Sequence, residues 1–548
     1  MRNWTIFMVG LTIGWGGVGP RPAVAQTVPV RVALTGTAAP TGGNYTISAA
    51  GFGNPVVNGT GQVAFTADLT GGTATRGVFT GAPGAVQTVA LTGLGTPGPA
   101  GSYNGFGNPV LNGTGTVAFD ANGLFGGSST QGMFMGTPGA VQTVALNNTA
   151  APVGGNYTSI GNPLLNGTGQ VAFNASLSIA NSGIFVGVPG AVQTVAVQGT
   201  VAPGGGNYSG FSVPVLSGAG QVAYRAGLTG GTSTEGIFRG TSTAVQTIAL
   251  KGTAAPTGGN YGNFGDPAVN GTGQVAFLSN LTVANAGIFT GTPTAVQAVA
   301  VSGTPAPAGG DYINFGNPVL NGTGQLAFRA DLTGGTSPAG IFAGTPGAIQ
   351  AVALQGTAAP AGGNYDIFNQ PPSVNGAGHV AFTATLTGAG VTAANNYALY
   401  VGSAGGVVKV VRSGDQVDVD PGIGIDLRTV RDPHHGRWTW WVADTLGLES
   451  TCEPFVTAAS TSATTRYSRA GRMAAASRSA TTAFSSTRSD SPTTRRACSC
   501  RSSHRCRSRP RSDWRRRSGW QWQGGSADGA DAGNTLVCRV SHRNGPEG

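Results

Sequence analysis

The sequence predicts an all-β fold, a β-propeller of about seven four-stranded blades. Three observations predict it. One eight-residue motif recurs seven times, each repeat unit holds four short extended runs, and the composition is rich in Gly and poor in charge. Only 9% of the 548 residues are Asp, Glu, Lys or Arg, while 94 are Gly. Such a composition, with many β-branched residues and few strong helix formers, favours short strands joined by turns.

The recurring motif reads Asn-Gly-Thr-Gly-Gln-Val-Ala-Phe and first occurs at residues 58–65. Its copies begin 51 to 54 residues apart. Asn and Gly reach left-handed backbone conformations at little cost, so the motif predicts a tight hairpin turn that leads into a strand. Three positions of the motif are expected to be structural: the Asn, the second Gly and the closing aromatic residue. They are Asn58, Gly61, Phe65, Asn112, Gly115, Phe119, Asn166, Gly169, Phe173, Gly220, Tyr224, Asn270, Gly273, Phe277, Asn321, Gly324, Phe328, Asn375, Gly378 and Phe382.

The sixth unit illustrates the predicted strands. Its extended runs cover residues 317–320, 325–332, 340–343 and 349–354, each bounded by Gly, Pro or Asn. A single sheet of this kind cannot bury both of its faces, so the units must stack. Four strands in roughly 50 residues is typical of a propeller blade, and a linear β-solenoid is the alternative. In either case the motif Phe residues are expected to pack between neighbouring sheets.

An additional copy of the last strand precedes the first unit, at residues 28–34. We expect it to complete a blade that begins at the other end of the repeats, because this removes an exposed sheet edge. Residues 26–412 then form the tandem-repeat propeller, and residues 413–430 are interpreted as the start of a degenerate eighth repeat whose remainder is lost in the tail.

Residues 1–25 are predicted to be a signal peptide. Arg2 precedes an apolar stretch, and a small-residue sequence, Ala23-Val24-Ala25, ends it. A membrane anchor would need about 20 unbroken apolar residues, whereas Gly, Pro and Arg21 interrupt this stretch. The sequence therefore predicts a secreted protein, extracellular or at the cell surface, with no membrane span in the mature chain.

Residues 431–548 form a second, chemically different part. They contain all five Cys and the basic excess behind the formal net charge of +10, since residues 27–411 carry seven basic and seven acidic side chains. We interpret this segment as a disordered tail, translated in a shifted reading frame. Two alternatives are disfavoured. A basic arm for nucleic acid does not suit a secreted protein, and a zinc site does not suit the Cys spacing, which fits no finger pattern.

The sequence predicts no enzyme: no catalytic, cofactor-binding or metal-binding residue is assigned. His379 replaces the Gln of the motif and is expected to start a strand. No nucleophile, base and acid recur together, and seven acidic residues in seven units leave little to cluster. A propeller-type hydrolase or lyase acting on carbohydrate remains the alternative.

The pattern Asn58-x-x-Gly61-x-x-Ala64-Phe65 and its copies resemble those of the bacterial choice-of-anchor tandem-repeat proteins that carry the NxxGxxAF motif. The resemblance covers residues 27–412 and implies export and sorting to the cell surface. This sequence departs from the family at its C-terminal part, where no apolar anchor helix is visible.

Together these patterns favour a binding or structural scaffold. Its expected partner is unknown, an extracellular polysaccharide or a protein, and not a nucleic acid. The chain is expected to be a monomer.

Overall fold

The computed structural model describes residues 6–9, 30–46, 51–98, 101–122, 125–126, 130–179, 181–360, 362–418 and 427–429. The chain divides into two compact units, residues 1–461 and 462–548, and every described residue lies in the first. All regular secondary structure in this described part is β-strand.

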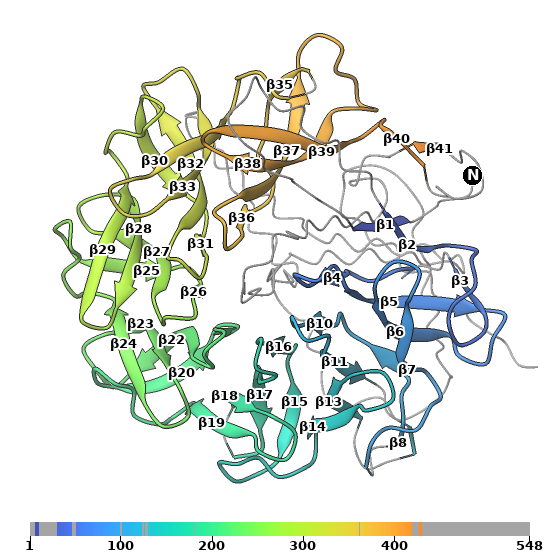
Figure 1. Cartoon of the computed structure of the whole chain (residues 1–548). Coiled ribbons are helices and arrows are strands. Elements are labelled where there is room, and N and C mark those ends of the chain that lie inside the picture. Colours follow the sequence, from blue (N-terminus) through green and yellow to red (C-terminus); the bar gives the residue numbers. More distant parts are fainter. Residues whose placement is uncertain are drawn as a thin grey trace, which may run out of the picture. The chain divides into compact units, whose positions relative to one another are not determined.

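Seven sheets of one plan follow one another along the chain (Figure 1). In the third sheet, β17 (Val171–Leu177) pairs with β18 (Gly183–Gly187), and β18 pairs with β19 (Gln193–Val197), all antiparallel. The other edge of β17 pairs with two segments, β15 (Tyr157–Ile160) and β16 (Leu164–Leu165). Each blade therefore has four rows of strands, and its first row is interrupted.

The same order recurs in the other six blades, as follows. Blade 1 comprises β3 (Asn44–Tyr45), β4 (Val56–Val57), β5 (Val63–Thr70), β6 (Arg76–Gly81) and β7 (Gln87–Leu91). Blade 2 comprises β9 (Gly105–Phe106), β10 (Val110–Leu111), β11 (Val117–Asn122), β13 (Gln131–Gly136) and β14 (Gln142–Leu146). Blade 4 comprises β20 (Asn207–Phe211), β21 (Val215–Leu216), β22 (Val222–Thr229), β23 (Glu235–Gly240) and β24 (Val245–Leu250).

Blade 5 comprises β25 (Tyr261–Phe264), β26 (Ala268–Val269), β27 (Val275–Leu281), β28 (Ala286–Thr292) and β29 (Ala295–Val301). Blade 6 comprises β30 (Asp311–Phe315), β31 (Val319–Leu320), β32 (Leu326–Thr333), β33 (Ala339–Gly344) and β34 (Gln350–Leu354). Blade 7 comprises β35 (Asn364–Tyr365), β36 (Ser373–Val374), β37 (Val380–Thr387), β38 (Tyr397–Ser403) and β39 (Gly406–Arg412). A short additional pair joins β8 (Gly101–Ser102), which precedes β9, to β12 (Phe125–Gly126), which lies between β11 and β13 in the sequence.

The fold is an all-β propeller, as the sequence predicted. All strand pairs of these seven sheets join strands of the same unit, whereas a β-solenoid pairs strands of successive coils. The four predicted runs of the sixth unit correspond to β31, β32, β33 and β34. The segment β30 was missed, because it follows a Gly-rich stretch that reads as a loop.

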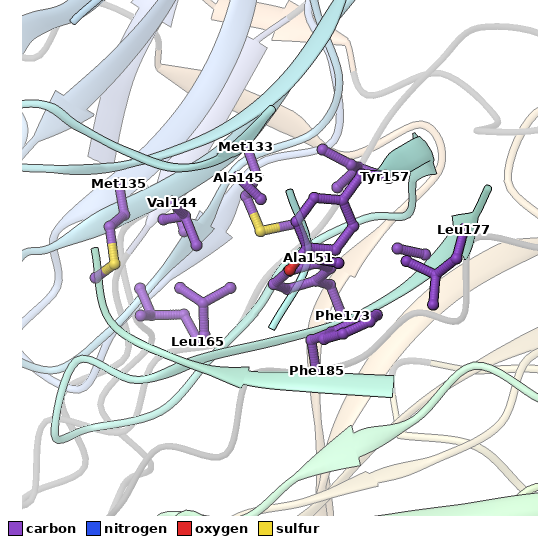
Figure 2. Packing of buried hydrophobic residues seen from close by; sticks show 14 of the residues in the cluster. Met133, Met135, Val144, Ala145, Ala151, Tyr157, Leu165, Phe173, Leu177 and Phe185 are labelled. Atoms are coloured by element: carbon purple, nitrogen blue, oxygen red, sulfur yellow. The ribbon is translucent and has the colours of Figure 1, made fainter. Parts of the chain in front are cut away.

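Neighbouring blades pack face to face, and their contact forms the core. Between blades 2 and 3, Met133 and Val144 pack against Tyr157, Phe173 and Phe185 in one buried cluster (Figure 2). The rings of Phe173 and Phe185 stack with centroids 5.6 Å apart, and Tyr157 meets Phe185 edge-on at 5.1 Å. Equivalent clusters occur at the five other seams between consecutive blades, so the repeated aromatic residues of the sequence fill the spaces between sheets.

The additional strand predicted before the first unit is β2 (Val30–Leu34). Its Val32 and Ala33 share a buried cluster with Tyr45 and Phe65 of blade 1. Val89 and Ala90 of β7 pack on blade 2 in the same way. The strand β2 therefore occupies, relative to blade 1, the place that a fourth strand takes relative to the following blade.

Two further pairs lie outside the seven blades. The strand β1 (Ile6–Val9) falls within the predicted signal peptide and pairs with β2. The strands β40 (Gln416–Asp418) and β41 (Leu427–Thr429) pair with each other inside the predicted start of an eighth repeat. The rest of the signal peptide, residues 419–426 and the predicted tail at 431–548 lie outside the described residues.

Candidate functional site

The motif Asn organises each hairpin turn through its side chain. In blade 3, Asn166 Oδ1 accepts hydrogen bonds from the backbone N of Gln170 at 2.8 Å and the hydroxyl of Thr168 at 2.9 Å. Its Nδ2 donates to Gln170 Oε1 at 3.1 Å and to the carbonyl of Ser217 in blade 4 at 3.3 Å. The Asn side chain thus forms hydrogen bonds both within its own turn and to the next blade.

The left-handed conformation belongs to the second Gly of the motif alone. Its φ lies between 79° and 86° in all seven copies, whereas the only described non-Gly residue with positive φ is Asn148, outside the motif. We expected Asn to share this role, but its contribution is the side-chain hydrogen bonding. A side chain on Gly169 would be strained, since L residues rarely adopt this φ.

The turn Asn side chains form a ladder from blade to blade. Nδ2 donates to the carbonyl oxygen of the motif's first residue in the next blade at five seams, over 2.8 to 3.3 Å. The donors are Asn58, Asn112, Asn166, Asn270 and Asn321, all buried. The closing aromatic residues of the motif are at most 2% exposed. The motif Asn and aromatic residues therefore lie in turns and seams, where they hold the blades together.

One exposed position recurs on the interrupted first row of each blade. It directly precedes a Pro, a constraint that keeps its backbone extended. Short strands follow it, and Figure 1 shows β4, β10, β16, β26, β31 and β36 on the inner side of the blades. We call these seven residues the inner row: Asn54, Asn108, Asn162, Val213, Asp266, Asn317 and Pro371. All seven are exposed, and four of them are the carboxamide Asn.

The sequence analysis missed this row. A repeated x-Pro step, four residues before each motif, was the available signal. In one seam the row itself bridges two blades, because the backbone N of Asn54 donates to Asn108 Oδ1 at 3.0 Å. A carboxamide both donates and accepts, so the inner row can meet a neutral ligand rich in hydroxyl or amide groups.

Charged side chains gather at the seam between blades 4 and 5. Arg225 Nη1 contacts Glu235 Oε1 at 2.9 Å, and its Nε contacts Asp266 Oδ1 of the inner row at 3.2 Å. Burial alone lowers the pKa of Arg225, but the hydrogen bonds and charges of the two carboxylates outweigh it, and the pKa is raised. Asp266 is 49% exposed and Glu235 only 14%, so one carboxylate faces solvent and the other is enclosed.

The carboxyl group of Asp120 is buried with one oxygen unpartnered. Asp120 on β11 is 5% exposed, its Oδ2 accepts from Asn122 Nδ2 at 3.2 Å, and its Oδ1 has no hydrogen-bond partner. Burial raises the pKa of Asp120, although backbone and Asn122 hydrogen bonds oppose the shift. Asp68 and Asp331, which occupy equivalent positions in blades 1 and 6, instead pair with Arg76 and Arg329.

Metal-ligating clusters are lacking in the part of the chain that the structure describes: no three His, Cys, Asp or Glu side chains converge there. His379 directly precedes β37 and its backbone N donates to Asn375 Oδ1 at 2.8 Å, the contact that Gln170 makes in blade 3. A helix of membrane-spanning length and hydropathy is likewise not found among the described residues.

Comparison with protein families gives one match, to a family of unknown function, DUF7453, over residues 23–182 and 179–434. The chain belongs to DUF7453. The two matched ranges include all seven blades of this DUF7453 member, as well as β2, β40 and β41. No curated protein is a significant match to the sequence.

Several solved structures are similar to the DUF7453 chain at low identity. The β-propeller domain of the Trilobed protease from Pyrococcus furiosus, described as having an open velcro topology, has a TM-score of 0.38 and 8% identity, and the match covers 66% of this chain and 98% of that domain. An oligogalacturonate lyase solved with manganese has a TM-score of 0.37 and 11% identity, with 67% and 95% covered. A puromycin-hydrolysing peptidase from Mycobacterium tuberculosis has a TM-score of 0.38 and 14% identity, with 70% and 57% covered.

Proposed function

We propose that this protein is an exported binding scaffold without catalysis, and that the inner row binds a neutral extracellular polysaccharide. The observation that carries the proposal is one exposed position that recurs in all seven blades and is Asn in four of them, on a framework whose motif aromatic residues are buried. A position that is repeated and exposed without serving the core is available for recognition.

The chemistry of the row favours a ligand rich in hydroxyl groups. The row residues Asn54, Asn108, Asn162 and Asn317 carry no charge, and the described part of the chain from residue 30 onward has few charged side chains to attract an ion. A hydroxyl group donates and accepts, as a carboxamide does, so the two are complementary. Blades that repeat the same residue suit a polymer that repeats the same sugar, since several weak contacts then act together.

Export and a surface location belong to the same proposal. The predicted signal peptide at residues 1–25 and the resemblance to choice-of-anchor repeat proteins support them. A polysaccharide outside the cell would meet the inner row there.

Glycan-array binding by the purified full chain tests the proposal. We expect binding to neutral polysaccharides and an affinity at least about tenfold lower for the double variant Asn162→Ala/Asn317→Ala, which removes two carboxamides. The matched control is Gln87→Ala/Gln142→Ala, which removes two exposed carboxamides from the fourth strands β7 and β14. An array without binding, or equal loss in both double variants at unchanged melting temperature, would contradict the proposal.

A further inference from the structure

The seam between blades 4 and 5 lacks the ladder bond that five other seams have. Ser217 stands where the motif Asn is expected. Its hydroxyl accepts from the backbone N of Gln221 at 3.0 Å, as Asn Oδ1 does elsewhere, but it has no amide nitrogen to donate onward. Gln221 Oε1, which an Asn would contact, is buried without a partner. The neutral connection at this seam is therefore missing.

The guanidinium of Arg239 makes a different hydrogen bond across this seam. Arg239 on β23 donates through Nη1 to the carbonyl oxygen of Gly273, in the turn of blade 5. Its Nη2 donates to Gln246 Oε1 of its own blade at 3.1 Å. The equivalent positions in blades 2 and 3 are Met135 and Val186, which are apolar. Burial lowers the pKa of Arg239, so the seam holds this charge at some cost in free energy.

Further charged groups replace neutral ones at the same seam. In blade 2, Gln131 forms two neutral hydrogen bonds to the backbone of Ile160 in blade 3. Its Nε2 donates to the Ile160 carbonyl at 2.6 Å, and its Oε1 accepts from the Ile160 N at 2.9 Å. Glu235 holds the corresponding place in blade 4 and accepts from the backbone N of Phe264 at 3.3 Å. Its other oxygen pairs with Arg225, which also reaches Asp266 in blade 5.

We propose that the seam between blades 4 and 5 is an ionic latch, at which the propeller opens first when the ionic strength rises. Salt weakens partly exposed ion pairs, such as that of Arg225 with Asp266. The Debye length, beyond which charges are largely screened, is roughly 3 Å at 1 M salt. Neutral hydrogen bonds, such as those of Gln131 and the Asn ladder, respond far less. Blades 1–4 and blades 5–7 then meet at a seam whose apolar core resembles those of the other seams and whose polar contacts depend on salt.

Hydrogen exchange measured peptide by peptide on the full chain tests the latch, because two equivalent backbone amides report the two kinds of seam. Between about 0.05 M and about 1 M NaCl we expect the exchange rate of the Phe264 amide to rise roughly tenfold. The Ile160 amide, held by neutral Gln131, is expected to change less than about twofold. Equal responses of the two amides would overturn the proposal.

Two variants rebuild the neutral seam from residues that the chain uses elsewhere. Ser217→Asn restores the ladder donor of Asn166, and Glu235→Gln copies the clamp of Gln131. We expect the double variant to lose most of the salt response at Phe264. The control Arg329→Gln removes an ion pair with Asp331 inside blade 6 and should leave the response at Phe264 unchanged. A salt response that persists in the double variant would also overturn the latch.

Discussion

Tyr hydroxyl groups show how single residues adapt to a repeated core. In blade 4 the motif Phe is replaced by Tyr224, and its hydroxyl lies 3.0 Å from that of Tyr208. In blade 3, Tyr157 corresponds to Tyr208 and Phe173 corresponds to Tyr224. The hydroxyl of Tyr157 therefore has no hydrogen-bond partner. Burial raises the pKa of Tyr157 to about 12, so the group stays neutral. The substitution at residue 224 thus satisfies a buried polar group that other blades leave unpaired.

Asp120→Asn is expected to stabilise the protein at neutral pH. Because burial raises the pKa of Asp120 above its unfolded value, the folded state favours the protonated carboxyl. Below the unfolded pKa, the carboxyl is protonated in both states and the folded state pays no cost for a buried charge. As the pH rises through the folded pKa, the buried carboxyl ionises and the free energy of unfolding falls. An amide stays neutral throughout, so the gain in melting temperature should be largest at neutral pH and small near pH 4, close to the ordinary carboxyl pKa of 3.8.

Thermal melting of both proteins across this pH range checks the prediction. Asp331→Asn is the matched control, because Asp331 pairs with Arg329 and gains from its charge. That substitution should not stabilise the protein. A gain for Asp120→Asn that is independent of pH would show that ionisation is not the cause.

The hairpin turn is the element that links one blade to the next. Asn112→Ser copies the natural Ser217: it keeps an oxygen that can accept from the backbone N of Thr116 and removes the donor to the Asn166 carbonyl. Because one buried hydrogen bond is lost, we expect the free energy of unfolding to fall by about 1 kcal/mol. Denaturant unfolding measures it.

The exposed turn residue Thr60 provides the contrast for this measurement. Thr60→Ser retains the hydroxyl that donates to Asn58 Oδ1 and touches no other blade, so it should cost little. If Asn112→Ser were equally mild, the ladder would not hold blades together.

The turns, the long strands and the packing of the motif Phe residues between sheets could be predicted from the sequence, but the polar contacts between blades could not. The motif at residues 58–65 located the turn and the second strand, because Gly61 requires a positive φ and Val63 to Phe65 favour a strand. One of the two segments of the first row was missed, since β15 contains Thr158 and Ser159 and follows a Gly-rich stretch. The inner row escaped notice because exposure depends on which strand lies at the sheet edge.

At the scale of the whole molecule, β2 covers the first blade as a fourth strand covers the blade that follows it. The opposite end differs. The motif Ala that faces the next blade is fully buried in blades 1 to 6, whereas Ala381 of blade 7 is half-buried. No eighth blade is present among the described residues to cover it. The predicted extra strand packs on blade 1, but the strand it pairs with among the described residues is β1, not a strand from the other end of the repeats. The predicted eighth repeat is represented among them only by β40 and β41.

Val32→Asp is expected to destabilise the molecule by more than about 2 kcal/mol, because it places an unpaired charge against Tyr45 and Phe65. Blade 1 should lose protection against hydrogen exchange before the other blades do. Val30→Asp, at the exposed end of the same strand, controls for the added charge. Equal effects of the two substitutions would mean that β2 does not cover blade 1.

The turn ladder also bears on how such genes change in length. Each rung joins a residue to its counterpart 51 or 54 positions later, so the bond partners at a seam are supplied by two adjacent copies of one coding segment. Unequal crossing-over between such segments inserts or removes a complete copy and leaves every remaining junction with matching partners. The number of units is therefore a trait that recombination can alter in one step, while point substitutions such as Ser217 record where individual junctions have diverged.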